Sequence, residues 1–225
     1  MSILHHPDSA LLLAYASGDL KTSSALLIAT HLALCPPCRK SVSDAEVVGG
    51  VYLDSIRPEP VNDNALRDVL RRLDDSDAMN GSAKTFAASP QHDHFIDGVR
   101  LPDPLRSWVD RPTMKSLEWN KLGFGIERID LTGDSDVVAT VMRIDPGRAM
   151  PRHGHNADEQ TLVLSGGFSD EFGHFGPGDI ECADEHVVHR PVADGDEPCV
   201  CLVVADAPIQ LVGPFGKFLQ PLVRF

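Results

Sequence analysis

The spacing of apolar residues in this chain changes from a helical period to an alternating period near Ser107. The first 75 residues contain apolar runs with the length and spacing of helices, such as SALLLAYASG, TSSALLIATHLALC and NDNALRDVLRRLDD. After Ser107 come short alternating or β-branched runs, such as DVVATVMRI and PCVCLVV, which are separated by glycine, proline and aspartate. We therefore expect an α + β chain with two domains of different class.

Helix start and stop residues divide the first 75 residues into about four helices. Asp8 is the expected N-cap of the first helix, and Gly18 is its expected end. Pro36 and Pro37 are expected to end or kink the second helix, because proline lacks an N–H and clashes with the preceding turn. Several helices have an apolar face too wide for a small bundle to bury. Two interpretations stay open: ordinary packing within the bundle, or an incomplete core that awaits a partner.

The remaining residues complete a three-part prediction for the chain. Residues 77–104 lack sustained periodicity and are rich in small residues, polar residues and proline, which is typical of a linker. His92 and His94 lie there and are expected to be solvated loop histidines. Many short strands with turn residues between them indicate an antiparallel barrel or sandwich. We predict a small all-α bundle over 1–76, a linker over 77–104 and an antiparallel β-barrel or sandwich over 105–225.

Charge and hydropathy restrict the class of protein. The formal net charge of −13 argues against direct binding of nucleic acid, which requires a basic face. No apolar run approaches the roughly 18 residues of a membrane helix, and no Lys or Arg precedes the apolar run near the start, as a signal peptide would require. We expect a cytoplasmic protein without membrane contact. In a reducing cytoplasm, cysteine clusters more often bind metal or do redox work than form structural bridges.

The stretch THLALCPPCRK places three potential metal ligands on one side of a helix. His31, Cys35 and Cys38 would fall within a sector of about 60°. A closed zinc site needs four such ligands, and the fourth could come from His5 or His6. The competing interpretation is a thioredoxin-like Cys-x-x-Cys, which normally follows a strand and opens a helix. A helical pattern precedes it here, so we favour zinc, although zinc thiolates can also be oxidised with loss of the metal.

A second set of ligands follows in PGRAMPRHGHNADEQTLVLSGGF. Its spacing, from Gly147 through His153, His155 and Glu159 to Gly166, resembles the first cupin motif without departure. Residues two apart on a strand face the same side, so both histidines would point into a barrel. Glu159 would supply a hard oxygen ligand beside the two imidazoles.

The second cupin motif matches in part over GPGDIECADEHVVHRPV. Counted from Gly178, His189 falls at the ligand position, and His186 is a rival candidate. The usual proline, second glycine and later asparagine are replaced by Asp184, His186 and Ala193. Three imidazoles and one carboxylate suit Zn, Mn, Fe, Ni or Cu, and the ligand set does not choose among these metals.

The first set of ligands also resembles a known family. His-x-x-x-Cys-x-x-Cys on a second helix, with an upstream histidine, looks like the zinc-binding anti-sigma domain. The phrase HH…ALLLAYASGDL…ATHLALCPPCRK resembles the ChrR-type branch of that family, which combines this domain with a cupin. The resemblance implies zinc bound by His6, His31, Cys35 and Cys38, with His6 rather than His5 assigned from the register of the motif. It also makes zinc the first choice for the cupin, held by His153, His155, Glu159 and His189.

The same resemblance implies a function. The helices would clasp an extracytoplasmic-function sigma factor in a 1:1 complex and cover the surfaces that bind RNA polymerase. The cupin would sense an oxidative signal, such as singlet oxygen or a related oxidant, and bring about release of the sigma factor. The chain would then be a transcriptional regulator and not an enzyme.

Two other functions remain as alternatives. The first is a metal-dependent cupin enzyme of the dioxygenase or lyase type with a helical interaction domain. Asp170, Glu171 and His174 could serve it as acid or base. The second is a thiol-redox sensor that works only through Cys35 and Cys38.

The other three cysteines lie in the β-rich part of the chain. Cys199 and Cys201 would lie on one face of a strand, either as small buried apolar residues or as a reactive thiol pair near the cupin metal. Cys182 is expected in the core.

Overall fold

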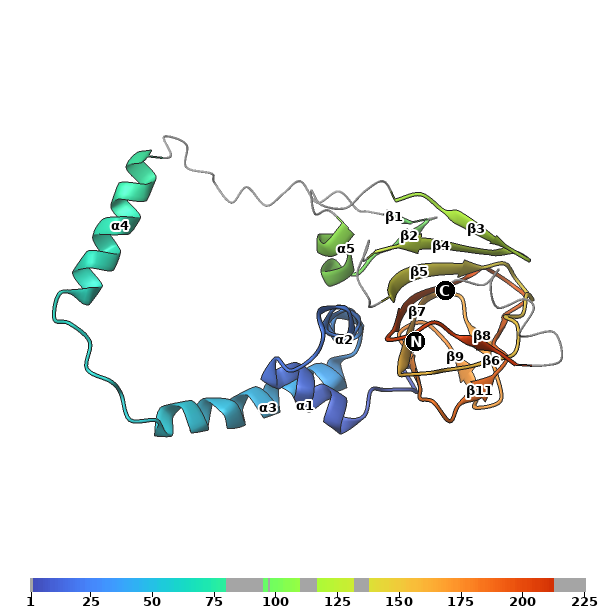
Figure 1. The fold of residues 1–225 in the computed structure, drawn as a ribbon, viewed down its shortest axis with the longest axis horizontal. Helices are drawn as coiled ribbons and strands as arrows, with labels where there is room; N and C mark the ends of the chain where they lie inside the picture. The colour runs from blue at the N-terminus through green and yellow to red at the C-terminus, as the bar shows by residue number, and fades with distance from the viewer. Residues whose placement is uncertain (1, 80–94, 97, 110–116, 132–137, 213–225) are drawn as a thin grey trace.

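A computed structural model (Figure 1) describes residues 2–79, 95–96, 98–109, 117–131 and 138–212. Its helices are α1 Ser9–Ser17, α2 Thr22–Leu34, α3 Pro36–Ser55, α4 Ala65–Met79 and α5 Asp103–Val109. The predicted combination of helices and an antiparallel β domain is confirmed. His92 and His94 lie outside the described residues.

The residues expected to bound the first helix do so. Asp8 is the N-cap of α1, and its carboxylate accepts a hydrogen bond from the Leu11 N–H at 2.7 Å. Gly18 ends the helix with a left-handed backbone, at φ 75°. As expected, α2 ends before Pro36 and Pro37, at Leu34, and the two prolines do not kink it. Instead they occupy the first positions of α3, where proline's missing N–H costs nothing, and Cys35 separates the two helices.

The β domain is built around one antiparallel sheet of six strands in the order β10-β7-β13-β5-β4-β3. These strands are β10 Ile180–Ala183, β7 Glu159–Ser165, β13 Cys199–Ala205, β5 Val138–Ile144, β4 Ile126–Asp130 and β3 Asn120–Gly123. A sheet of this size, with further short sheets against it, matches the predicted barrel or sandwich.

Three smaller antiparallel sheets complete the described structure. Two have three strands each: β11 Val188–His189, β6 His153–Gly154 and β14 Gln210–Leu211, and β12 Val192–Ala193, β8 Phe168–Ser169 and β9 His174–Phe175. The last pairs β1 Phe95–Ile96 with β2 Val99–Arg100. The last pair and the start of α5 lie inside the stretch expected to be a linker, and the domain boundaries stay predictions.

Alternate residues of β13 belong to two different hydrophobic clusters, one on each face of the large sheet. Val200, Leu202 and Val204 belong to a cluster that also contains α2 and α5, with Leu27, Ile28 and Leu105 fully buried in it. The next residues along the strand, Cys199, Cys201 and Val203, belong to the cluster inside the β domain, with Phe168 and Phe175. This alternation is the ordinary period of a strand. One face of the sheet therefore shares a core with α2 and α5, and the other face packs into a second core inside the β domain.

The interpretation of Cys182 as a core residue is wrong. Its neighbours Glu181 and Ala183 are buried, whereas Cys182 is exposed. Ile180, two residues earlier on the same side of the strand, is buried in the cluster that contains the helices. Cys182 lies on the same face of β10 as Ile180, but beyond the part of that face that the helix-containing cluster covers.

An extended segment of residues 2–7, here called the N-terminal strap, precedes α1 and runs beside the β domain (Figure 1). The Leu4 and His5 N–H groups both donate to Asp179 Oδ1, at 2.6 and 2.9 Å. The Ile180 N–H donates to the carbonyl oxygen of His5 at 3.1 Å. The strap thus lies along β10, which is the edge strand of the large sheet.

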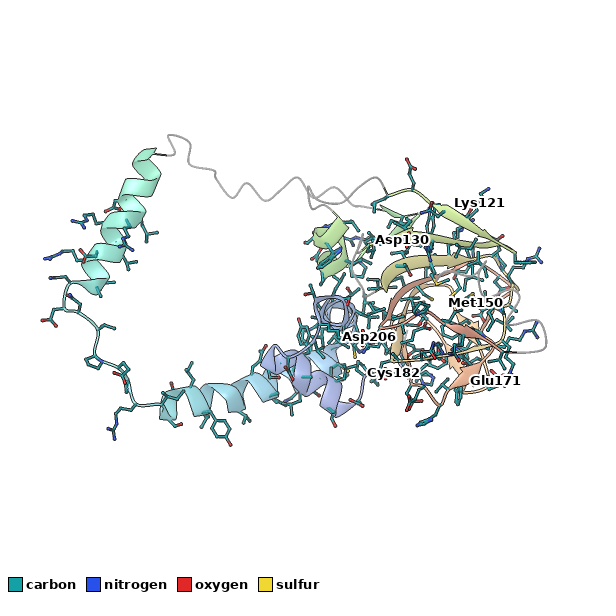
Figure 2. The ribbon with its side chains drawn as sticks, in the orientation of Figure 1. Lys121, Asp130, Met150, Glu171, Cys182 and Asp206 are labelled. Atoms are coloured by element: carbon teal, nitrogen blue, oxygen red, sulfur yellow. The ribbon has the colours of Figure 1, made fainter. Side chains whose placement is uncertain are left out.

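The second half of α3 and residues 65–74 of α4 have apolar side chains that nothing in the described structure covers. More than half of each such side chain is exposed, from 51% for Leu70 to 72% for Tyr52 and Leu66. The others are Val47, Val48, Val51, Leu53 and Ile56 on or at the end of α3, and Val69 and Leu73 on α4. In Figure 2 these two stretches stand away from the rest of the chain. Of the two interpretations left open, the structure favours an incomplete core.

The described helices include none whose length and apolarity would allow it to cross a membrane.

Candidate metal centres

Four predicted ligands from the N-terminal part lie together. One side-chain atom from each of His6, His31, Cys35 and Cys38 falls within 4.8 Å of the others; we call this set the helical cluster. The strap supplies His6, α2 supplies His31, Cys35 lies between α2 and α3, and Cys38 is in the first turn of α3. The two Sγ atoms each lie 3.4 Å from His6 Nδ1. The junction between α2 and α3 groups the last three, which the sequence placed on one helix, and the strap adds the first.

The orientation of His31 fits a metal. Its ring is fully buried, and its Nδ1 lies 2.9 Å from the carbonyl oxygen of Gly178, an acceptor, so Nδ1 carries the hydrogen. Nε2 is then an acceptor, and it is buried with no hydrogen-bond partner among the described residues. Buried polar atoms rarely lack a partner. A backbone carbonyl that fixes one ring nitrogen while the other faces a ligand set is typical of metal-binding histidine.

The thiols point to the same conclusion. Burial, together with a hydrogen bond that the Cys38 thiol donates to Cys35, raises the pKa of Cys38 to about 12. Without a metal, the protonated thiol of Cys38 would lie beside the imidazole of His6 in the protein interior. A bound zinc ion would displace the thiol protons and bind the sulfur atoms of Cys35 and Cys38 as thiolates. Two thiolates with two imidazoles are a set that zinc accepts in a tetrahedral site.

The two N-terminal histidines have different surroundings. The ring of His5 packs against Phe175 of the β domain, with 4.4 Å between ring centroids. His6 points into the helical cluster. Its choice over His5 agrees with this placement, and its role as a ligand stays a prediction.

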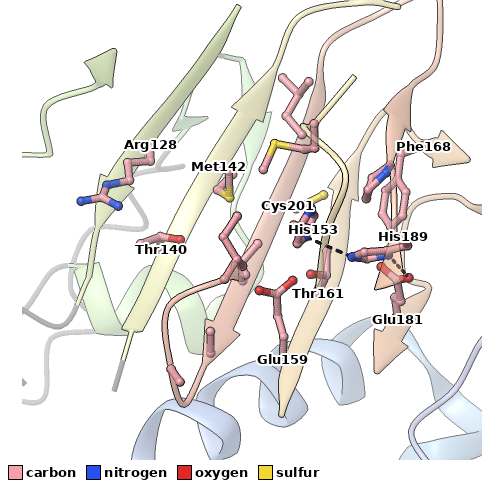
Figure 3. Close-up of a pocket in the computed structure, with 17 residues that line it drawn as sticks. Arg128, Thr140, Met142, His153, Glu159, Thr161, Phe168, Glu181, His189 and Cys201 are labelled. Atoms are coloured by element: carbon pink, nitrogen blue, oxygen red, sulfur yellow. Dashed lines mark hydrogen bonds and ion pairs between the residues drawn. The ribbon is translucent and has the colours of Figure 1, made fainter. Parts of the chain in front are cut away.

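The second set of predicted ligands also lies together, inside the β domain. His153, His155, Glu159 and His189 each place one ligand atom within 4.8 Å of the others; we call them the β-domain cluster. His189 Nε2 lies 3.1 Å from His153 Nε2 (Figure 3). It also lies 3.2 Å from His155 Nε2. Three ring nitrogens this close, beside a carboxylate, need a cation or protons between them. The rival candidate His186 has an exposed side chain at 83% and lies outside the set.

Strand pairing brings these ligands together. His153 on β6 and His189 on β11 are direct partners in the antiparallel register. His155 follows β6, and Glu159 begins β7 of the large sheet. The side chains of all four are buried, so they face one another and not solvent.

Two carboxylates hold the outer side of His189. Its Nδ1 donates to Asp170 Oδ2 at 2.8 Å and to Glu181 Oε1 at 2.9 Å, which leaves Nε2 facing the β-domain cluster. His153 Nδ1 donates in the same way to the carbonyl oxygen of Pro151, at 2.8 Å. Such contacts fix the tautomer and orientation of ligand histidines.

Sequence reasoning missed Glu181 and considered Asp170 only as an acid or base. The sequence feature that could have indicated Glu181 is its position as an acidic residue within the short β-strand sequence DIECA. The other acid–base candidates lie outside this network: Glu171 pairs with Arg152 and His174 with Asp194, both at the surface.

A small cavity of about 60 Å³ adjoins the β-domain cluster (Figure 3). Apolar side chains such as Met142, Met150 and Phe168 line it beside His153 and Glu159. Cys201 also lines it, with its Sγ 3.4 Å from that of Cys199. Both thiols are buried, as the structural interpretation expected.

Burial and charge set the protonation of the β-domain cluster in the absence of metal. Burial lowers the pKa of His153 and of His155 to about 4, so both are neutral at pH 7. Burial also acts to lower the pKa of His189, but the hydrogen bonds and charge of Glu181, and then Asp170, outweigh it and raise that pKa to about 9. Burial raises the pKa of Glu159 to about 7.

These pKa values predict how metal binding at the β-domain cluster depends on pH. A metal must displace the proton of His189, so we expect affinity to rise about tenfold per pH unit between pH 7 and 9. Below pH 7 the rise should be steeper, because Glu159 is also protonated there. Zinc titration against a chelator measures this, with Cys35→Ser and Cys38→Ser removing the other site. An affinity that does not change from pH 7 to 9, after correction for the chelator, would contradict the assignment.

Comparison with known proteins gives three findings. Residues 111–208 match the model of the ChrR cupin-like domain. The anti-sigma-E factor ChrR of Cereibacter sphaeroides is 37% identical over 224 residues, which cover all of both chains. The crystal structure of Rhodobacter sphaeroides SigE in complex with the anti-sigma ChrR matches with a TM-score of 0.73 and 35% identity, covering 91% of this chain and all of that one.

Proposed function

The chain belongs to the ChrR family of anti-sigma factors, and on this premise we propose that it binds and inhibits an extracytoplasmic-function sigma factor in a 1:1 complex. Its relatives by sequence and structure are regulators, and the chain is a regulator rather than an enzyme. The sigma factor is its protein partner, as SigE is for the ChrR of the matched complex. We place this activity in the cytoplasm, where sigma factors meet RNA polymerase.

The uncovered apolar faces of α3 and α4 carry this proposal. A monomer that exposes large apolar side chains along two successive helices has an interface without its partner. On α4 the exposed residues Leu66, Val69, Leu70 and Leu73 follow the i, i+3, i+4, i+7 spacing of one helix face. Such a face fits an apolar groove on a partner.

The test is to identify the partner and then measure inhibition. The tagged full chain is purified from its host, and mass spectrometry identifies bound proteins. We expect one sigma factor at equal stoichiometry, and we expect the chain to block transcription from that sigma factor's promoters in vitro. Recovery of the intact chain without any sigma factor, from cells that express several, would overturn the proposal.

We propose that zinc occupies the helical cluster and that zinc or another divalent transition metal occupies the β-domain cluster. At the helical cluster the metal would hold the strap, α2 and α3 together. At the β-domain cluster His153, His155, Glu159 and His189 would bind it, leaving the adjoining cavity for a small reactant. The metal there would supply a site at which an oxidant can act.

We further propose that an oxidative signal, such as singlet oxygen or a related oxidant, acts through the β-domain cluster and releases the sigma factor. The cluster is buried beside a small cavity and contacts no part of the exposed α3–α4 faces. This separation is consistent with a β domain that senses the oxidant and with helices α3 and α4 that bind the sigma factor.

Removing two ligands separates these roles. With His153→Ala and His155→Ala, we expect unchanged inhibition but a loss of induction by at least about tenfold when a photosensitiser and light generate singlet oxygen. A reporter on a sigma-dependent promoter measures both states. His186→Ala is the matched control, because His186 is an exposed histidine of the same domain. Normal induction in the double variant would refute sensing through this cluster.

A further inference from the structure

The β domain supplies groups that hold the ligands of the helical cluster. Gly178 accepts the hydrogen bond from His31 Nδ1 at 2.9 Å, which turns His31 Nε2 toward the cluster. Gly178 has φ 93°, and an added Cβ would come within 2.6 Å of Ile3 in the strap. The positive φ favours glycine here, because any other residue would be strained in this conformation.

Asp179, the next residue, holds the strap itself. Its Oδ1 accepts from the N–H groups of Leu4 and His5, and its Oδ2 accepts from the Gly176 N–H at 2.8 Å. The side chain is 4% exposed. These bonds lower the pKa of Asp179, although burial alone would raise it. The residue that follows Leu4 and His5 is His6, so Asp179 fixes the backbone immediately before a ligand of the helical cluster.

The same short stretch of chain reaches the other cluster. Glu181, two residues after Asp179, accepts the hydrogen bond from His189 Nδ1 at 2.9 Å. Residues 178–181 therefore contact ligands of both clusters: His31 and the strap at one end, and His189 at the other. A shift of β10 that changes the Glu181–His189 contact would also move Gly178 and Asp179.

From these contacts we infer that Gly178 and Asp179 of the β domain are positioning residues of the helical metal site, and that β10 couples metal binding at the two clusters. This inference rests on the proposed metal occupancy of both clusters. Coupling between sites is reciprocal, so each metal should strengthen binding of the other by the same factor. Loss of metal from the β domain would then lower the metal affinity of the helical cluster several-fold. A structural zinc site binds tightly enough to stay occupied after such a loss, so inhibition without the signal is unchanged.

Cobalt(II) distinguishes the two sites. Only the helical cluster contains thiolates, so only this cluster gives sulfur-to-cobalt charge-transfer absorption. Titration of the full chain with cobalt(II) against a chelator, followed at this absorption, measures the affinity of the helical cluster alone. The wild-type titration first tests the proposed metal occupancy of the helical cluster, because absence of the band would refute that occupancy whatever the variants do.

Asp179→Ala is expected to weaken cobalt(II) binding at the helical cluster by about tenfold, the usual lower range for loss of an outer contact. Asp179→Asn retains one acceptor oxygen and should restore part of that loss. Asp206→Ala is the matched control. It removes another carboxylate between the β domain and the helices, the Lys21–Asp206 ion pair at 2.7 Å, but not the contact with the strap. We expect it to change the affinity by less than twofold.

Coupling is measured by adding His153→Ala and His155→Ala. In the wild-type background, this removal of the β-domain site should weaken the helical site by about fivefold or more. In the Asp179→Ala background it should have no further effect. Equal affinity of Asp179→Ala and wild type would overturn the inference. So would an equal loss of metal at both clusters together with a lower unfolding temperature, since that pattern indicates a general structural role.

Discussion

Replacing Cys35 and Cys38 with serine is expected to abolish binding of the sigma factor, with affinity falling by at least about 100-fold. Serine keeps the shape of the side chain but provides no thiolate, so zinc loses half of its ligands. Binding of structural zinc contributes about 10–16 kcal/mol to the folding of small zinc domains. The strap, α2 and α3 would lose the ion that we propose holds them together, and the exposed faces of α3 and α4 would lose their fixed orientation.

The measurement is inhibition of sigma-dependent transcription, combined with gel filtration and elemental analysis of the purified variant. Cys182→Ser is the control, because Cys182 is an exposed cysteine outside both clusters. It should bind and inhibit as wild type does. Full inhibition by the Cys35→Ser, Cys38→Ser variant at wild-type concentrations would show that the helical cluster is not needed for binding of the sigma factor.

Replacing Leu66 and Leu70 with aspartate is expected to weaken sigma binding by about 1,000-fold without lowering the stability of the free chain. The two side chains are 72% and 51% exposed, so the free protein loses little packing. In a complex they would be desolvated apolar anchors, and each such anchor typically contributes about 2 kcal/mol or more. A buried aspartate would add the cost of an unpaired charge.

Isothermal titration with the purified sigma factor measures this loss, and thermal unfolding of the free variant checks its stability. Arg71→Ala is the control on the same helix. Arg71 lies on the opposite side of α4 from the apolar face and pairs with Asp68. It should bind within about threefold of wild type. If the Leu66→Asp, Leu70→Asp variant still binds tightly, the sigma factor does not bind the apolar face of α4.

Local patterns in the sequence predicted the parts of the structure that local geometry determines. The alternation of apolar residues indicated the β domain, and Asp8 and Gly18 bounded α1 as expected. The spacing of His31, Cys35 and Cys38 predicted that they lie together, although they meet where α2 ends and α3 begins and not on one helix. The structure brings all eight predicted ligands into two sets. The prolines after Cys35 were harder to interpret, because the same residues can end one helix or begin the next.

Contacts that depend on how the two domains pack were not predictable from these patterns. Asp179 and Gly178 contact the strap and His31 across more than 140 residues of sequence. The burial of Glu181 beside His189 depends on pairing between short strands that no period identifies. The prediction that Cys182 lies in the core was wrong for a related reason. Alternation along a strand predicts which face of the sheet a residue lies on, but not how much of that face the helices cover.

The contact between Leu4 and Asp179 joins residues 175 positions apart, which sets the order in which this protein can be completed during translation. At about 5–20 residues per second, a ribosome needs roughly 10–35 s to reach Asp179 after it has made Leu4. During that time α1, α2 and α3 leave the ribosome while the residue that anchors His6 has not been made. The strap is therefore the last part of the helical site to be fixed in place, and a chain whose synthesis stops before β10 lacks this anchor.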